Sequence, residues 1–242
     1  RDYYASRGLG DVYKRQPFDP KEKVIEYLVE DDSKARLVNL TARGLAEETA
    51  SESPAPGGGS ISAYMGDLGA ALGKMVANLT AHKAAYDDRW KEFSDAAEKG
   101  QELMEQLLHL VDEDTAAFNM IMNVFAMPKK TPEEKAARAE AMEKATLYAT
   151  EVPLRTMETS FKAFDLIRNM AENGNPASVT DAGVGALATR AAVRGAFLNV
   201  KINAAGLKDR EAAERLIARG AEIEKEAAKA EEEILAIVNS KI

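Results

Sequence analysis

The sequence predicts an all-α fold, a bundle of long antiparallel helices joined by short loops. Apolar residues recur at helical spacing along most of the 242 residues, and no stretch alternates strictly enough to be a strand. Hydrophobic residues make up 45% of the chain, which is enough to bury a core. Only 6% of the residues are aromatic while alanine is abundant, so the helices should pack closely through small side chains.

The N-terminal part of the chain is predicted to lie outside this bundle. Residues 1–16, RDYYASRGLGDVYKRQ, carry three tyrosines and no helical period, and we interpret them as an artefactual or disordered tail. Residues 17–35 are predicted to be a linker-like segment with a short amphipathic helix in KEKVIEYLVE. Residues 36–242 would form the main helical domain, and we expect the natural chain to extend further upstream.

The first helices of the domain have recognisable start signals. Thr41 is suited to cap a helix over residues 42–50, because its hydroxyl can accept a backbone hydrogen bond. The stretch SPAPGGGS, residues 53–60, is predicted to be a loop, and the next helix runs from Ile61 to about His82. One face of that helix carries large apolar residues, Ile61, Met65, Leu68, Leu72, Met75 and Leu79. A second face carries small residues, which let helices approach closely: Gly66, Gly69, Ala70, Gly73 and Ala77.

Two very long helices are expected next. The first covers residues 87–125 and ends before Pro128. The second begins at the strong start signal TPEE, with Thr131 as its N-cap, and runs to about Glu172. Pro153 lies inside this second helix, where a proline is expected to kink it.

The last two helices follow a loop at NGNPAS. Thr180 or Asp181 is predicted to cap the first of them, which runs to about Ala205. Asp209 starts the final helix, which is rich in Glu and Lys. This helix is predicted to have one charged, solvated face and an apolar stripe on the other side.

Charge and composition exclude several function classes. A net charge of -8 argues against nucleic acid or an anionic membrane as the main partner. The chain has no cysteine, which excludes disulfides, thiolate nucleophiles and zinc–thiolate sites and agrees with a reducing, cytoplasmic location. No apolar run reaches the roughly 18 residues of a membrane span. With only two histidines no His-rich metal site is possible, and no metal is expected.

One acid is placed where an apolar residue should be. In LLHLVDEDTAAFNMIM the apolar stripe includes Val111 and Phe118, and Asp114 fills the gap between them. A carboxylate on a buried stripe loses water, so its pKa should rise, and an acid that keeps its proton near neutrality can act as a general acid. The alternative is that Asp114 pairs with a buried cation or amide. Asp112 and Glu113 are expected to face water.

The glycines of residues 57–60 form a second candidate site. Gly57, Gly58 and Gly59 lack side chains and precede a helix, so their backbone N–H groups and Ser60 can approach a polar or anionic ligand closely. The stretch is neither a Walker A loop nor a GxGxxG motif. Taken alone, it is better explained as the turn that starts a helix.

A third candidate is the pair of amides in FLNVKIN. Asn199 and Asn203 are four residues apart and share a helix face, where each amide needs partners. They could bridge helices or bind a heterocycle with donor and acceptor edges. Asp181 could contact a ligand, although an N-cap role explains it better. Lys83 could meet an acidic substrate tail or simply face solvent.

Five motifs in order give the chain a family resemblance. They are SPAPGGGSISAYMGDLGAALGKMVANLT, LVDEDTAAF, AMPKKTPEEK, NGNPASVTDAGVGALA and FLNVKIN. Together they resemble the C-terminal cyclodeaminase/cyclohydrolase domain of the formiminotransferase-cyclodeaminase family, over nearly everything from Pro17 onward. PFDPKEKVIEYLV resembles the linker that follows a formiminotransferase domain in the bifunctional enzyme, so a fused or associated glutamate formiminotransferase is implied as a partner.

The resemblance implies an all-helical homodimer with a folate pocket. The implied enzyme is an ammonia-lyase that converts 5-formimidoyltetrahydrofolate to 5,10-methenyltetrahydrofolate and ammonia, with no cofactor beyond the folate substrate. The family's proton donor is the second Asp of the VDxDxxAF pattern, which is Asp114 here. Residues 57–60, Asn199 and Asn203 would then contact the folate, and Lys83 its glutamate tail. A bifunctional parent would place the reaction in histidine degradation, and a free-standing protein in one-carbon metabolism.

Two other functions remain open at this point. The first is methenyltetrahydrofolate cyclohydrolase on the same fold, in which water attacks the methenyl bridge and a base is needed instead of an acid. The second is a non-enzymatic helical dimerisation module, which would explain the small-residue faces and the charged last helix. It would not explain an acid on a buried stripe.

Overall fold

The computed structural model describes residues 36–242, so the predicted tail 1–16 and linker-like segment 17–35 lie outside the described residues. Residues 40–242 form one compact unit. The described part is helical throughout, without a strand, and contains η1 (Leu37–Asn39), α4 (Ala42–Thr49), α5 (Gly58–Ala81), η2 (Ala84–Tyr86), α6 (Trp90–Phe125), α7 (Pro132–Asn173), η3 (Pro176–Ser178), α8 (Val179–Ala204) and α9 (Arg210–Asn239). The prediction of an all-α fold is confirmed.

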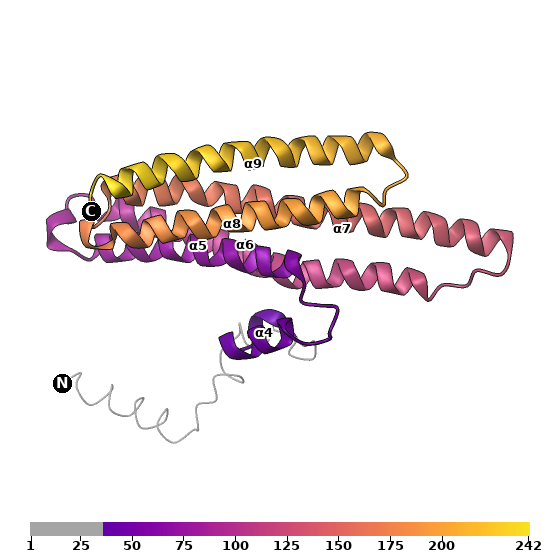
Figure 1. The fold of residues 1–242 in the computed structure, drawn as a ribbon. Helices are drawn as coiled ribbons and strands as arrows, with labels where there is room; N and C mark the ends of the chain where they lie inside the picture. Colours follow the sequence, from indigo (N-terminus) through magenta and orange to yellow (C-terminus); the bar gives the residue numbers. More distant parts are fainter. Residues whose placement is uncertain (1–35) are drawn as a thin grey trace, which may run out of the picture. The chain divides into compact units, whose positions relative to one another are not determined.

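The five long helices, α5 to α9, run alongside one another and reverse direction at each short connection (Figure 1). α5 packs on α6, α7 and α8, while α9 packs on α7 and α8. In the 40–242 unit, α5 is therefore a central helix whose N-terminus lies among three neighbours. That N-terminus carries the glycines singled out in the sequence.

Most helix starts follow the predicted capping chemistry. Thr41 accepts a hydrogen bond from the Gly44 N–H, and Thr131 forms a capping box with Glu134. Asp209 accepts from the Ala212 N–H at the start of α9. In α8 the prediction is wrong, because the helix begins earlier, with Ser178 as the N-cap residue.

The small-residue face of α5 is the one that turns inward. Gly66, Gly69, Gly73 and Ala77 are buried, whereas Leu68 and Leu79 on the large apolar face are 43% and 45% exposed. A Cβ at Gly69 would overlap the Thr189 hydroxyl of α8, so close contact between the two helices requires glycine there. The spacing correctly predicted two faces but not which of them is buried.

The exposed apolar residues of α5 are matched on α8. Val184, Leu187, Leu198 and Ile202 are 47% to 73% exposed, and their spacing places them on one face of that helix. Within residues 36–242, no helix is both long enough and apolar enough to cross a membrane.

Candidate functional site

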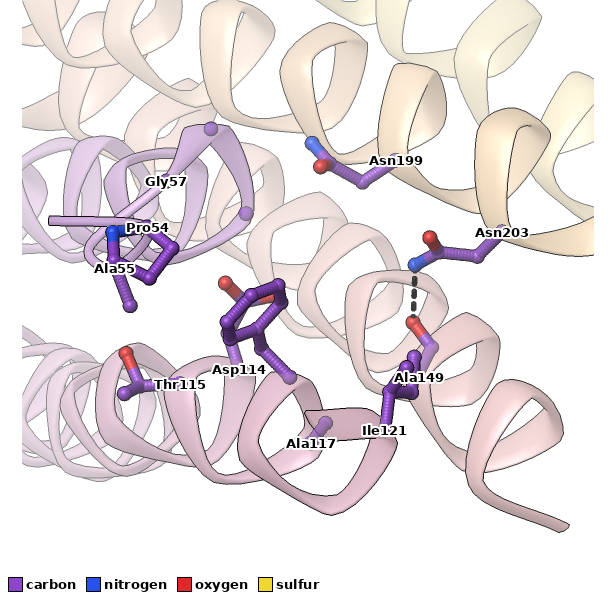
Figure 2. Close-up of a pocket in the computed structure, with 13 residues that line it drawn as sticks. Pro54, Ala55, Gly57, Asp114, Thr115, Ala117, Ile121, Ala149, Asn199 and Asn203 are labelled. Carbon is purple, nitrogen blue, oxygen red and sulfur yellow. Dashed lines mark hydrogen bonds between the residues drawn. The ribbon is translucent and has the colours of Figure 1, made fainter. Parts of the chain in front are cut away.

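A cavity of about 190 Å³ opens at the N-terminus of α5. Its walls come from the loop before α5 and from α5, α6, α7 and α8, so five parts of the chain meet there (Figure 2). The lining residues are Pro54, Ala55, Gly57, Gly58 and Gly59 from the loop and α5, Asp114, Thr115, Ala117, Phe118 and Ile121 from α6, Ala149 from α7, and Asn199 and Asn203 from α8.

The glycine stretch is part of the helix and not a loop, which corrects the prediction. α5 begins at Gly58, with Gly57 in extended backbone as the N-cap residue and no side-chain cap. The first N–H groups of a helix have no partner within it, and the helix dipole places positive charge there. The start of α5 therefore presents backbone donors at the cavity, as predicted, but from the first helical turn.

Gly59 is required because a carboxylate occupies the space of its missing side chain. A Cβ at Gly59 would overlap the carboxylate of Asp114 on α6. At Gly58 the added atom would meet Asn199 Nδ2 at an ordinary 3.5 Å, and at Gly57 nothing closer than 3.9 Å. Of the three glycines lining the cavity, Gly59 is the one that the site geometry requires.

Ser60 holds Asp114 from behind. Its hydroxyl donates a hydrogen bond to Asp114 Oδ2 at 2.9 Å and lies 3.3 Å from the hydroxyl of Thr115. Ser60 is fully buried and does not line the cavity, so the structure places it behind the acid and not against a ligand. This fixed position orients the carboxyl group toward the cavity.

The pKa of Asp114 is raised above its ordinary value. The main cause is burial, which removes water from the charged form, and hydrogen bonds from the side chain and backbone N–H of Ser60 oppose part of the rise. The stripe pattern thus predicted both the position and the direction of the pKa shift of Asp114.

The neighbouring acid has a different environment. Glu113 was expected to face water, but its side chain is only 11% exposed and accepts hydrogen bonds from Tyr148 and Arg155 of α7. Burial opposes its ionisation, yet these two donors outweigh it, and the pKa of Glu113 is lowered. The pKa is therefore lowered for Glu113 and raised for its neighbour Asp114. Of the two, only Asp114 lines the cavity.

Asn199 and Asn203 both line the cavity, as predicted. Asn199 Nδ2 donates to the Gly195 carbonyl of its own helix at 3.0 Å, and Asn203 Nδ2 donates to the Ala149 carbonyl of α7 at 2.6 Å (Figure 2). Because each amide uses a donor in the protein, the acceptor oxygens of both remain available to a ligand.

Two predicted ligand residues are not brought to this cavity. Lys83 follows the far end of α5, roughly 35 Å along the helix from Gly57, where its Nζ donates to Asn175 Oδ1 at 2.7 Å. Asp181 lies in the first turn of α8, roughly 27 Å along that helix from Asn199. Ser178, three residues earlier, is the N-cap, so Asp181 is not. Its negative charge instead interacts favourably with the positive end of the helix dipole, and it does not line the cavity.

Several cavity residues were missed. The apolar stripe predicts core packing for Phe118, and Thr115, Ile121 and Ala149 are not among the predicted site residues. A local signal for Ala149 does exist, because Pro153 follows it by four residues in the helix. In residues 36–242, no group of three or more His, Asp or Glu side chains is arranged to hold a metal ion.

Comparisons with known proteins find relatives that cover most of the chain. Residues 41–222 match the family model described as formiminotransferase-cyclodeaminase. Over 204 residues the chain is 38% identical to a methenyltetrahydrofolate cyclohydrolase of Methylorubrum extorquens, covering 84% of this chain and 98% of that protein. Over 194 residues it is 37% identical to the formimidoyltransferase-cyclodeaminase of Mus musculus, covering 80% of this chain and 36% of that one. The chain thus spans nearly all of the first relative and about a third of the second.

A solved structure shares the fold. The crystal structure of a formiminotetrahydrofolate cyclodeaminase from Thermotoga maritima superposes with a TM-score of 0.74 at 23% identity, covering 84% of this chain and 97% of that one. At that identity the likeness supports the helical fold alone.

Proposed function

Because this chain belongs to the formiminotransferase-cyclodeaminase family, we propose that it converts 5-formimidoyltetrahydrofolate to 5,10-methenyltetrahydrofolate and ammonia. The observation that carries the proposal is the partly buried carboxyl group of Asp114, which lines the cavity with a raised pKa. Its neighbours are the backbone donors of α5 and the amides of α8. A cavity acid whose pKa is raised suits a reaction whose leaving group must be protonated.

The proposed chemistry proceeds in two steps. Nitrogen 10 of the folate attacks the formimidoyl carbon, a carbon–nitrogen bond forms, and the proton of nitrogen 10 passes to the former imine nitrogen. The resulting tetrahedral carbon carries an amino group. Asp114 protonates that amino group. The bond between the carbon and this nitrogen then breaks, its electron pair stays with the nitrogen, and ammonia leaves. The lone pair of nitrogen 5 forms a double bond to the carbon, which gives the methenyl cation. The cation lies beside the carboxylate of Asp114, and solvent then returns a proton to Asp114.

The other cavity groups are assigned to binding. Backbone N–H groups of Gly58 and Gly59 would contact polar atoms of the folate, and Asn199 and Asn203 would bind its heterocycle. Ser60 keeps the acid in place. The reaction as written requires no cofactor beyond the folate substrate.

Methenyltetrahydrofolate cyclohydrolase is the second candidate, and the Methylorubrum relative favours it. In that reaction water attacks the methenyl bridge and a base takes its proton, a role for the ionised form of Asp114. The rise in the pKa of Asp114 favours its protonated form over the ionised one, and for that reason we place cyclodeaminase first.

A comparison of the two substrates tests this order. The purified chain is given 5-formimidoyltetrahydrofolate, with ammonia as the measured product, and separately 5,10-methenyltetrahydrofolate, with the 10-formyl product measured. We expect a larger kcat/KM for the first. A larger value for the second, above the uncatalysed rate, would establish the cyclohydrolase instead. Tetrahydrofolate that fails to bind at all would support a non-enzymatic helical module.

The homodimer stays a prediction, and the exposed apolar face of α5 and α8 is where we propose the second copy packs. Leu68 and Leu79 lie on one of these adjoining helices and Leu187 and Leu198 on the other, all more than 40% exposed. An apolar face of this kind is typical of a protein–protein contact. Sedimentation equilibrium should give twice the mass of the chain, and a monomer at micromolar concentration would contradict it. The Mus musculus relative is longer than this chain, so a fused formiminotransferase also remains a proposal.

A second, basic cavity lies about two helix turns from the site and replaces Lys83 as the candidate for the glutamate tail. It measures about 230 Å³ and is lined by Phe125, Met142, Ala139 and four cations, Lys129, Lys135, Arg138 and Lys208. Phe125 follows Phe118 by seven residues on α6, and Met142 precedes Ala149 by seven on α7. Each pair shares a helix face two turns apart, roughly 10 Å.

In the described part of the chain the side chains of these cations are not paired with carboxylates, although Glu143 accepts hydrogen bonds from the backbone N–H of Lys208 at 2.9 and 3.1 Å. Among the described residues, none of the four forms an ion pair, although the chain is acidic overall with a net charge of -8. Arg138 instead donates to the Val124 carbonyl at 3.1 Å and lies over the ring of Phe125. We propose that these cations attract the carboxylates at the end of the folate.

Charge reversal in the basic cavity is therefore expected to weaken substrate binding. Lys135→Glu and Lys208→Glu should each raise KM about threefold to tenfold at low salt, with little change in kcat, because they act on attraction and not on the reacting atoms. The effect should shrink at high ionic strength. Lys225→Glu, on the exposed surface of α9, makes the same charge change and should leave KM unchanged. Equal effects of all three variants would refute a local tail site.

A further inference from the structure

A proline in the middle of a helix explains why one carbonyl faces the cavity. Pro153 lies inside α7, which continues through it from Pro132 to Asn173. Proline has no N–H, so the carbonyl four residues earlier cannot make its usual helical hydrogen bond. That carbonyl belongs to Ala149. Proline is also the least favourable residue inside a helix, so its presence at a buried position suggests a use.

The freed carbonyl is the one that reaches the site. Of the residues of α7, Ala149 is the one that lines the cavity. Its oxygen accepts the hydrogen bond from Asn203 Nδ2 at 2.6 Å, which joins α7 to α8 across the cavity wall (Figure 2). Pro153 is buried and does not line the cavity itself, so the path by which it can affect a ligand is through Ala149 and Asn203.

This arrangement leaves two acceptors side by side. A carbonyl oxygen has two lone pairs, and Asn203 uses one of those on Ala149. One N–H of the Asn203 Nδ2 makes that bond, which turns the amide so that its Oδ1 can accept a hydrogen bond from a ligand. Two adjacent acceptors match two adjacent donors, such as an amino group next to a ring N–H.

We propose that Pro153 is a positioning residue, which keeps the Ala149 carbonyl out of the helix so that it and Asn203 together accept hydrogen bonds from the amino and ring N–H donors of the substrate's pteridine. This inference rests on the proposed folate function. It deepens that function by naming the edge of the ring that α7 and α8 would recognise. A purely structural proline would instead leave ligand binding unchanged when it is replaced.

The test uses Pro153→Ala, which restores an N–H able to bond the Ala149 carbonyl. The variant should be at least as thermally stable as the wild type, because a helix-breaking residue has been removed. Its Kd for tetrahydrofolate should rise about tenfold, the loss expected for a hydrogen bond in the site. Pro132→Ala, at the first position of the same helix where proline costs no hydrogen bond, should change neither quantity.

A double variant separates positioning from general damage. Asn203→Ala alone should weaken tetrahydrofolate binding to a similar extent, and Pro153→Ala combined with it should be little weaker than either, because both act through one carbonyl. Additive losses would overturn the proposal, as would unchanged binding in a folded Pro153→Ala.

A readout without folate keeps the test independent of the proposed function. The side-chain amide signals of Asn203, assigned in nitrogen-15 NMR spectra by their loss in Asn203→Ala, should shift in ligand-free Pro153→Ala. They should not shift in Pro132→Ala. If the wild type failed to bind tetrahydrofolate, the proposed function would fail, while these signals would still show whether Pro153 controls the Ala149–Asn203 bond. Unshifted signals would overturn that control.

Discussion

Asp114→Asn is expected to lower kcat for ammonia release about a thousandfold, within the range that a general acid contributes. Asparagine keeps the size of the side chain and can still accept the hydrogen bond from Ser60, but it has no acidic proton to give to the departing amine. KM should change little, because the step that is lost occurs after binding. Steady-state ammonia release, with circular dichroism to confirm folding, measures this.

The control for Asp114→Asn is Asp165→Asn, which neutralises an exposed carboxylate on α7 away from the cavity. It should retain the wild-type rate. Activity in Asp114→Asn within a few-fold of wild type would contradict the role of proton donor.

The pH dependence should follow the same acid. Asp114 works as a donor only while protonated, so kcat should fall as the pH rises through its raised pKa. The hydrogen bonds from Ser60 favour the ionised form and lower the pKa of Asp114. Ser60→Ala should therefore move the falling limb of the kcat profile to higher pH. A limb that does not move would contradict the assignment of that limb to Asp114.

Gly59→Ala is expected to lower kcat about a hundredfold, the scale reported for a displacement of roughly an ångström at a reacting group. The new Cβ would overlap the Asp114 carboxylate, so either the acid or the start of α5 must shift. The hydrogen bond from Ser60 to Asp114 would be disturbed at the same time. Ammonia release measures the loss, and the melting temperature shows how much of it comes from destabilisation.

Gly58→Ala is the matched comparison for Gly59→Ala. It makes the same change one residue earlier, where the added atom meets Asn199 Nδ2 at 3.5 Å. It should keep most of the activity and stability. Equal losses in the two variants would mean that general damage to the helix start, and not the contact with Asp114, explains the result.

The sequence alone was sufficient to predict the helices and the position of Asp114, because both depend on local patterns. Thr131 and Asp209 start their helices through hydrogen bonds to residues three positions away. Asp114 was identified because it interrupts an apolar stripe on its own helix. Capping and periodicity depend on a few neighbouring residues, so they can be derived without a tertiary structure.

Contacts between helices could not be derived in the same way. The need for glycine at Gly59 depends on which turn of α6 lies against α5, and the partners of Glu113 come from α7. Periodicity places residues on a common face without saying which face is buried, so the exposed position of Leu68 was missed. For Lys83, charge alone gave no indication of its distance from the cavity.

The most direct test of the proposed function is a single-turnover reaction with enzyme in excess over 5-formimidoyltetrahydrofolate. Ammonia and the absorbance of the methenyl product are followed in the same sample, for the wild type and Asp114→Asn. If Asp114 protonates the leaving amine, the wild type forms both products in equal amounts at one rate, and Asp114→Asn binds the substrate but forms both about a thousandfold more slowly. A wild type that binds the substrate without releasing ammonia would contradict the proposed function.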